Sequence, residues 1–155
     1  MRILFMGTPE FAAAALAAIA KAYPNEVVGA VTRQDTPKNR GHAMTPPPVK
    51  ILAQSLGIPV YQPANLKAEN FRETLDACAP DIIIVAAYGR ILPAYVLDAP
   101  RFGCINIHAS LLPKYRGAAP IQRAILAGET EVGVTIMKME AGIDTGDMYK
   151  KASFS

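Results

Sequence analysis

Two polar side chains at the end of one apolar segment, and a carboxylate after a later one, are the residues of this sequence best suited to chemistry. Asn106 and His108 are two residues apart, so strand geometry places both side chains on one face. Asp144 lies in a glycine-rich turn, 142–147, that follows the apolar run 132–139. Together, an amide, an imidazole and a carboxylate can supply an oxyanion donor, an acid/base group and a group that orients it.

The same three residues have a simpler interpretation. An asparagine and a histidine at the end of a strand often do no more than hydrogen-bond that strand end. An aspartate in a glycine-rich turn usually binds its own backbone. Their spacing alone therefore leaves catalysis and local structure both open.

Length and composition favour a single domain with a hydrophobic core. The chain has 155 residues, of which 51% are apolar, enough for a real core. No apolar run reaches the length of a membrane span, and the first apolar stretch is too short for a signal peptide. The two cysteines, Cys78 and Cys104, have no metal-ligand spacing. We expect buried, reduced thiols in a cytoplasmic protein, and no metal site.

The positive charge is concentrated in one segment. The chain carries 16 basic and 13 acidic residues, for a net charge of +3. Segment 32–50 contains four of the basic residues and one acidic residue, so the other residues balance. This segment is therefore the part of the chain expected to meet a polyanion.

Segments with the length and composition of strands alternate with segments patterned as helices. The strands are expected at 2–6, 26–32, 58–61, 82–86, 104–108, 132–139 and from 148 onward. Helices are expected after Thr8, as a capping residue, and at 46–56, 67–77, 93–97 and from Pro120. Residues 33–45 are expected to form a long polar loop. This order predicts an α/β protein with a Rossmann-like, mostly parallel sheet and helices on both faces.

Ligands of such sheets bind beyond the carboxyl ends of the strands. The loops at 7–9, 88–93 and 108–117 all leave such ends, so we expect them to share one cleft. The first of these loops lacks the G-x-G-x-x-G pattern of dinucleotide sites. A bound nicotinamide or flavin cofactor is therefore not expected.

Three motifs resemble the formyltransferases that use 10-formyltetrahydrofolate. They are NIHASLLPKYRGAAPIQRAI from residue 106, GVTIMKMEAGIDTGDM from residue 133 and FMGTPEFA from residue 5. The last is similar to the opening of the branch that formylates methionyl-tRNA. It differs from the branch acting on glycinamide ribonucleotide, which has a glycine- and serine-rich phosphate loop at this position.

The resemblance implies roles for particular residues. The family's catalytic asparagine, histidine and aspartate correspond to Asn106, His108 and Asp144. Its folate contacts correspond to two segments, Ser110, Leu111, Leu112 and Pro113 in one and Arg90, Ile91 and Leu92 in the other. We expect these segments to form opposite walls of a folate site, with Leu112 on a loop rather than in the core. Residues 88–93 are also compatible with ordinary packing between a strand and a helix.

Segment 32–50 resembles the family's insertion that reaches the acceptor arm of tRNA. The chain keeps Asp35, Pro37, Arg40 and Gly41 of that insertion, but it has Gln34 and Asn39 where proline and glycine are usual. The residues expected to contact tRNA are Arg33, Lys38 and Arg40. The alternative interpretation is a solvated loop without a partner.

As a whole, the resemblance implies a cytoplasmic and monomeric enzyme that formylates initiator methionyl-tRNA with 10-formyltetrahydrofolate. Members of the family are about twice as long, so residues 1–155 are expected to be an incomplete N-terminal catalytic domain without the family's C-terminal β-barrel domain. Such a piece need not be active alone. Three alternatives remain at this point: a formyltransferase acting on an amino-sugar nucleotide, a hydrolase that releases formate from the same folate, and a catalytically silent folate-binding module.

Overall fold

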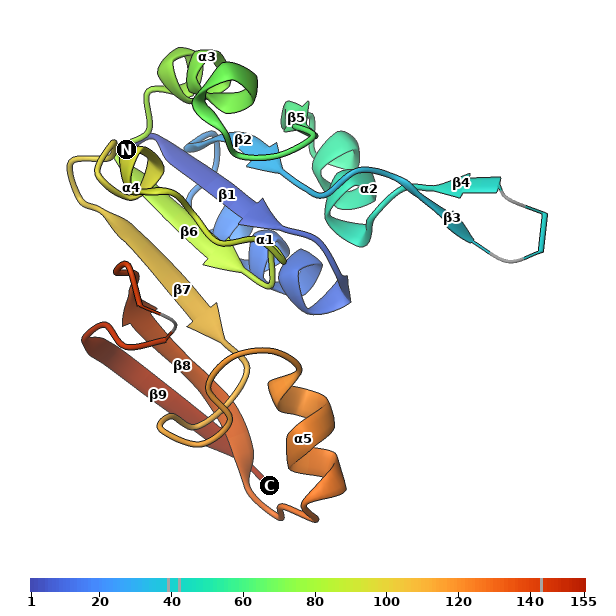
Figure 1. The fold of residues 1–155 in the computed structure, drawn as a ribbon, viewed down its shortest axis with the longest axis vertical. Helices are drawn as coiled ribbons and strands as arrows, with labels where there is room; N and C mark the ends of the chain where they lie inside the picture. Colours follow the sequence, from blue (N-terminus) through green and yellow to red (C-terminus); the bar gives the residue numbers. More distant parts are fainter. Residues whose placement is uncertain (39, 42, 143) are drawn as a thin grey trace.

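A seven-stranded sheet organises the protein in a computed structural model, which describes residues 1–38, 40–41, 43–142 and 144–155 (Figure 1). Its strands, in sheet order, are β5 (Val60–Tyr61), β2 (Val27–Val31), β1 (Ile3–Gly7), β6 (Ile82–Ala86), β7 (Cys104–His108), β8 (Val132–Lys138) and β9 (Met148–Phe154). The helices are α1 (Glu10–Ala22), α2 (Pro48–Ser55), α3 (Ala68–Cys78), α4 (Ala94–Leu97) and α5 (Pro120–Leu126). None of these helices is long and apolar enough to cross a membrane.

The sheet is parallel from β5 to β7, and β8 and β9 continue it in antiparallel fashion. The predicted mostly parallel α/β fold is therefore confirmed. The chain first adds strands on one side of β1 and then crosses to the other side to form β6. This reversal creates a topological switch point between β1 and β6, where ligands of such sheets usually bind.

The central strand β1 shows why helices cover both faces. Its residues are all buried, and they alternate between two hydrophobic clusters. Leu4 and Met6 pack with α3 and α4 residues such as Phe71 and Val96, whereas Ile3 and Phe5 belong to the cluster that includes α1 and α2. A strand buried on both faces must be apolar at every position, as this sequence is.

Thr8 does not cap α1, contrary to the expectation from sequence. Pro9 occupies the position before the helix, and the structure has no side-chain capping bond there. The Thr8 hydroxyl instead donates to the Tyr88 carbonyl at 3.1 Å, and the Arg33 backbone N–H donates to Thr8 Oγ1 at 3.4 Å. The Thr8 side chain thus makes a tertiary hydrogen bond in place of the helix cap expected from the local sequence pattern. The contact ties together three loops at the carboxyl end of the sheet.

The segment expected to be a polar loop contains a hairpin. Strands β3 (Thr36–Lys38) and β4 (Ala43–Thr45) pair antiparallel and extend away from the sheet (Figure 1). The pattern missed them because strands of three residues are too short to show an alternation of apolar and polar side chains. Asp35 fixes the base of the hairpin: Lys50 Nζ lies 3.1 Å from its carboxylate, and Gln62 Nε2 donates to it at 2.8 Å. The bond from Gln62 and the pairing with Lys50 lower the pKa of Asp35 and so favour its charged form.

Both cysteines are free and buried. Burial, with Asp98 nearby, raises the pKa of Cys104 to about 12, so at pH 8 only about one thiol in ten thousand is the reactive thiolate. We therefore expect Cys104 to resist iodoacetamide in the folded protein at pH 8 and to react once urea unfolds it. Mass spectrometry of digests taken with and without urea measures this. Rapid labelling of Cys104 in the folded state would contradict the buried placement.

Candidate active site

Asn106, His108 and Asp144 meet at the carboxyl end of β7. Asn106 Nδ2 donates to Asp144 Oδ1 at 3.4 Å, and His108 Nδ1 lies 3.5 Å from Asp144 Oδ2. The first two side chains share one face of β7, as their spacing predicts. His108 is only 6% exposed, so its ring is held away from bulk water. The structure therefore brings the three predicted residues together.

The other ring nitrogen of His108 faces a backbone carbonyl. His108 Nε2 lies 2.8 Å from the carbonyl oxygen of Tyr115, and a carbonyl can only accept, so Nε2 carries the proton. The ring thus has an acceptor on each side, the Tyr115 carbonyl and the Asp144 carboxylate. A doubly protonated imidazolium has a partner for each N–H in this arrangement.

Asp144 is fixed by the loop that follows β7. The Gly117 backbone N–H donates to Asp144 Oδ2 at 2.8 Å, and Arg116 Nε donates to the Asp144 backbone carbonyl at 3.1 Å. Asp144 has a φ of 52°, a left-handed conformation that non-glycine residues adopt at some cost. The contacts from Gly117 and Arg116 therefore hold the Asp144 carboxylate toward β7.

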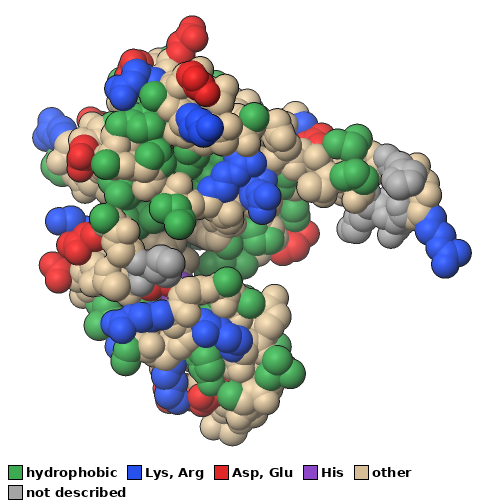
Figure 2. Space-filling model, in the orientation of Figure 1, with side chains coloured by type: hydrophobic (Ala, Val, Ile, Leu, Met, Phe, Trp, Pro, Cys, Tyr) green, Lys and Arg blue, Asp and Glu red, His purple; other side chains and the backbone are tan. Residues whose placement is uncertain are grey.

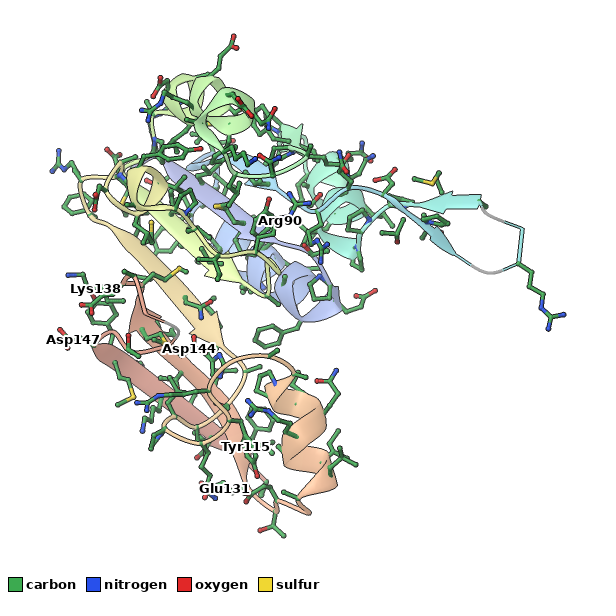
Figure 3. The ribbon with its side chains drawn as sticks, in the orientation of Figure 1. Arg90, Tyr115, Glu131, Lys138, Asp144 and Asp147 are labelled. Carbon is green, nitrogen blue, oxygen red and sulfur yellow. The ribbon has the colours of Figure 1, made fainter. Side chains whose placement is uncertain are left out.

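These residues form the floor of a cavity of about 610 Å³. One wall consists of residues 88–91, and Arg90 lies on this wall while Asp144 belongs to the opposite part of the molecule (Figure 3). The other wall consists of residues 117–122, and Pro9 and Phe11 close one end. Figure 2 shows the molecular surface hollowed between these two parts. The prediction that loops 7–9, 88–93 and 108–117 share one cleft is confirmed.

Arg90 and Ile91 line this cavity, but Leu92 does not. Arg90 Nη1 donates to the Pro63 carbonyl at 3.0 Å, and the Ile91 side chain is 77% exposed. Leu92 is only 4% exposed and packs in the core cluster with Val96. Arg90 and Ile91 therefore belong to a wall of the cavity. The Leu92 side chain instead joins the core cluster that includes Val96 of α4.

Residues 110–113 surround a second cavity, of about 650 Å³, and they do not face Arg90 across the first. The expected pair of opposite walls is therefore wrong, because 117–122 forms the wall facing Arg90. Thr135 explains the placement of segment 110–113. Its hydroxyl donates to the Ser110 carbonyl at 2.7 Å and accepts the Leu112 N–H at 3.1 Å.

Leu112 lies in the interior, contrary to the expectation of a loop side chain. Its backbone belongs to a loop, but its side chain is only 2% exposed. The two cavities share Phe11, Ala109 and Ile121, so they adjoin one another. Segment 110–113 therefore borders the site through its backbone and its neighbours more than through the Leu112 side chain.

The three residues expected to contact tRNA are spread over the structure. Arg33 lies at the base of the hairpin, where its side chain covers Gly89 so closely that a β-carbon there would meet Arg33 Cδ at 3.0 Å. Arg40 is exposed at the far end of the hairpin, between β3 and β4. Lys38 ends β3, and its side chain lies outside the described part of the structure. The structure thus separates Arg33, at the rim of the cavity, from Arg40.

Sequence reasoning missed the groups that hold the floor of the cavity in place. The Tyr115 carbonyl and the Gly117 N–H are backbone groups, so no residue type marks them. The glycine at position 117 is the only hint in the sequence, because glycine readily adopts the positive φ, here 86°, that this turn requires. Thr135 stands opposite His108 in the β7–β8 pairing, on the same face of the sheet. The alternation of side chains along β8 predicts that face, but it does not predict the hydrogen bonds of Thr135 to Ser110 and Leu112.

A metal centre receives no support from the described residues. Among residues 1–38, 40–41, 43–142 and 144–155, no three histidine, cysteine or acidic side chains gather closely enough to hold a metal ion. The charged and polar groups present can stabilise a developing oxyanion and accept or donate a proton.

Comparisons with known proteins agree on one family. A family model described as formyl transferase matches residues 1–155. A methionyl-tRNA formyltransferase of Aromatoleum aromaticum is 60% identical over 97% of this chain and 48% of the relative, and one of Desulfotalea psychrophila is 56% identical over 96% and 46%. The chain spans about half the length of the curated relatives it matches. A crystal structure of phosphoribosylglycinamide formyltransferase from Bacillus halodurans superposes with a TM-score of 0.77 at 25% identity, covering 100% of this chain and 80% of that one.

Proposed function

We propose, because this chain belongs to the formyl transferase family, that it transfers a formyl group from 10-formyltetrahydrofolate to the α-amine of methionyl-initiator tRNA. The reaction class is supported by the Asn106, His108 and Asp144 cluster on the floor of a cavity. The choice of methionyl-tRNA is supported by the identity of 56–60% with relatives of that name. In this proposal residues 1–155 belong to the catalytic domain of a cytoplasmic enzyme of translation initiation.

The reaction is an acyl transfer between two nitrogens. The amine attacks the formyl carbon, a tetrahedral oxyanion forms, and the bond from that carbon to N10 of the folate breaks. The proton lost by the amine passes through a water held by Asp144 and replaces the formyl group on N10. Proton transfer by a positioned carboxylate typically contributes a factor of about 10²–10⁴.

Asn106 and His108 act on the oxyanion. An amide nitrogen has two N–H groups, so Asn106 can donate one to Asp144 and the other to the negative oxygen. A protonated His108 ring, whose N–H groups face Tyr115 and Asp144, adds positive charge beside it. Donors that the fold holds in fixed positions stabilise such charge better than freely reorienting water does. No nucleophilic side chain is needed, because the amine of the acceptor is itself the nucleophile.

The cavity beside Arg90 suits the flat ring of the folate. Its walls are largely apolar, and a few polar groups converge on its floor, a common pattern for small-molecule sites. The second cavity adjoins it at Phe11, Ala109 and Ile121. A folate whose ring lies near Arg90 and Ile91 therefore has room to extend toward Ser110, Leu111 and Pro113.

An acceptor assay tests the proposal against its alternatives. The full-length protein is incubated with formyl-labelled 10-formyltetrahydrofolate and either methionyl-tRNA, an amino-sugar nucleotide or no acceptor. We expect label on methionyl-tRNA alone. Label on the sugar nucleotide, or formate released without an acceptor, would replace the proposal with the corresponding alternative. Folate binding without any transfer would indicate a silent binding module.

The hairpin is the proposed contact for tRNA. Its base is fixed by Asp35, Lys50 and Gln62, whereas Arg40 is exposed at its far end. Lys50 pairs with Asp35, and the other basic residues in the sequence of this segment are Arg33, Lys38 and Arg40. A basic hairpin of this kind suits contacts to the phosphate backbone rather than to bases.

Neutralising Lys38 and Arg40 together, as K38Q/R40Q, should therefore raise KM for methionyl-tRNA and reduce its dependence on salt. The logarithmic salt slope of tRNA binding should fall by roughly one unit for each phosphate that the hairpin no longer neutralises. Folate affinity should stay the same, because the folate site lies on other loops. Titrations of binding at several potassium chloride concentrations measure the slope.

Lys21→Gln is the matched control, since Lys21 is exposed in the last turn of α1, at the end of that helix remote from the cavity. It removes one positive charge without touching the hairpin. An unchanged slope in K38Q/R40Q, or an equal change per charge in Lys21→Gln, would mean that the hairpin does not contact tRNA.

A further inference from the structure

One four-residue loop, 114–117, contacts both titratable residues of the proposed active site. The Tyr115 carbonyl accepts from His108 Nε2 at 2.8 Å, and the Gly117 N–H donates to Asp144 Oδ2 at 2.8 Å. The position of this loop therefore sets the position of the His108 ring and of the Asp144 carboxylate together. A contact that fixes this loop therefore also fixes the positions of His108 and Asp144.

The loop needs an external support. Tyr115 has a φ of 58°, in the left-handed region that a bulky residue adopts only when its surroundings hold it there. The Ser110 hydroxyl donates to the Lys114 carbonyl at 2.6 Å, which fixes the start of the loop. The orientation of Tyr115 itself depends on its side chain, which lies near α5 (Figure 3).

Glu129, in the turn after α5, provides that support. Its Oε1 accepts from the Tyr115 hydroxyl at 2.8 Å and from Lys114 Nζ at 3.1 Å. The Arg123 guanidinium lies over the Tyr115 ring, 5.5 Å from its centre. These contacts hold two successive residues of the loop from one carboxylate. The mechanism described above does not use Glu129, Lys114 or the Tyr115 side chain.

We propose that Glu129 is a positioning residue for His108, acting through Tyr115. The inference rests on the proposed formyl transfer, but the contact itself is a property of the fold. By holding the Tyr115 hydroxyl, Glu129 keeps the Tyr115 carbonyl opposite His108 Nε2. The ring is then fixed with its other nitrogen toward Asp144. Displacement of a catalytic group by about 1 Å can cost on the order of a hundredfold in rate.

The protonation behaviour of this cluster agrees with a persistent contact. The bond from Tyr115 and the pairing with Lys114 lower the pKa of Glu129, so its carboxylate is charged at neutral pH. The bond to Glu129 raises the pKa of Tyr115, so its hydroxyl keeps the proton that it donates. A charged acceptor makes this the stronger class of hydrogen bond.

Four variants separate positioning from general destabilisation. Glu129→Leu removes the acceptor at similar size, and Tyr115→Phe removes the donor but leaves the backbone carbonyl. Glu129→Gln keeps an oxygen that can accept from the hydroxyl, so it is the conservative rescue. Glu131→Gln makes the same charge change two residues away, at an exposed side chain (Figure 3).

Nitrogen-15 NMR of labelled histidine gives a readout that does not depend on activity. The chain has two histidines, His42 and His108, and a His108→Gln spectrum assigns the signals. In the wild type the His108 Nε2 proton should be visible, because its bond to the carbonyl slows exchange with water. We expect it to persist in Glu129→Gln and Glu131→Gln and to broaden or vanish in Glu129→Leu and Tyr115→Phe.

Kinetics should follow the same pattern. Glu129→Leu and Tyr115→Phe should lower kcat at least about tenfold, and their KM values should stay within twofold of the wild type. An unchanged His108 signal in both variants would overturn the proposal, as would an equal loss of kcat in Glu131→Gln. A response of the His108 signal in a protein that transfers no formyl group would support the positioning and overturn the proposed function. Tyr115→Phe keeps the test informative if Glu129→Leu fails to fold.

Discussion

Replacing His108 with alanine should lower kcat for formyl transfer by about a thousandfold or more, with folate affinity within severalfold of the wild type. The expected loss reflects two roles of one ring, stabilisation of the oxyanion and orientation of the proton path through Asp144. A thousandfold corresponds to about 4 kcal/mol of transition-state stabilisation. Ground-state binding should change little, because a group that acts on the transition state contributes mainly to kcat.

Asp144→Asn is the matched partner of that experiment. The amide keeps the size of the carboxylate and an oxygen able to accept the Gly117 N–H, which lies 2.8 Å from Oδ2 in the wild type. It loses the negative charge beside His108 Nδ1 and the capacity to accept a proton through water. We expect a loss of rate similar to that of His108→Ala, and the double variant should be little worse than either single one, because the two residues act as a unit.

Single-turnover rates and folate binding by fluorescence, with a thermal melt for each variant, measure these effects. Retention of kcat within tenfold of the wild type in either variant, with an unchanged melt, would remove that residue from the mechanism. A loss of folate binding equal to the loss of rate would indicate a binding role instead.

The layers of the fold were predictable because the parallel strands are buried on both faces. Strands 82–86 and 104–108 were expected with the bounds that the structure has. The first is an unbroken apolar run, which is typical of a strand buried on both faces, and the second alternates Ile105 and Ile107 with the polar Asn106 and His108. The hairpin of β3 and β4 was missed because each strand has only three residues, too few to show an alternation, and because Pro37 in β3 is of a type rare inside strands. Thr8 was misassigned because its hydroxyl binds the Tyr88 carbonyl, which is 80 residues away in the chain.

The meeting of Asn106, His108 and Asp144 was predictable for a different reason. Residues two apart on a strand share a face, and β8 runs antiparallel beside β7, with Lys138 opposite Ile105. The turn after β8 therefore begins near the start of β7, within reach of the Asn106 and His108 side chains. The contacts that hold these three side chains in place could not be predicted from residue types. The Tyr115 carbonyl and the Gly117 N–H are present in any sequence, and only the left-handed path of the loop directs them to His108 and Asp144.

The burial of Leu112 gives a second prediction with a large effect, this time on stability. Leu112→Asp should lower the free energy of unfolding by roughly 3–5 kcal/mol, because it removes a buried apolar side chain and leaves a carboxylate without a partner in its place. The side chain is 2% exposed, and its N–H is fixed to Thr135. In urea, a loss of this size moves the unfolding midpoint by roughly 2 M for a typical small domain.

Ile91→Asp is the control, since it makes the same substitution in a loop side chain that is 77% exposed. Its unfolding midpoint should stay close to the wild type, within roughly 0.5 kcal/mol of stability, while its folate affinity falls because a charge now lines the apolar wall. The pair of variants thus separates a residue that builds the domain from one that faces the ligand. A wild-type midpoint in Leu112→Asp, with weakened folate binding, would place the Leu112 side chain in the site after all. Folate would then lie against segment 110–113 directly, and the cavity beside Arg90 would hold the acceptor end instead.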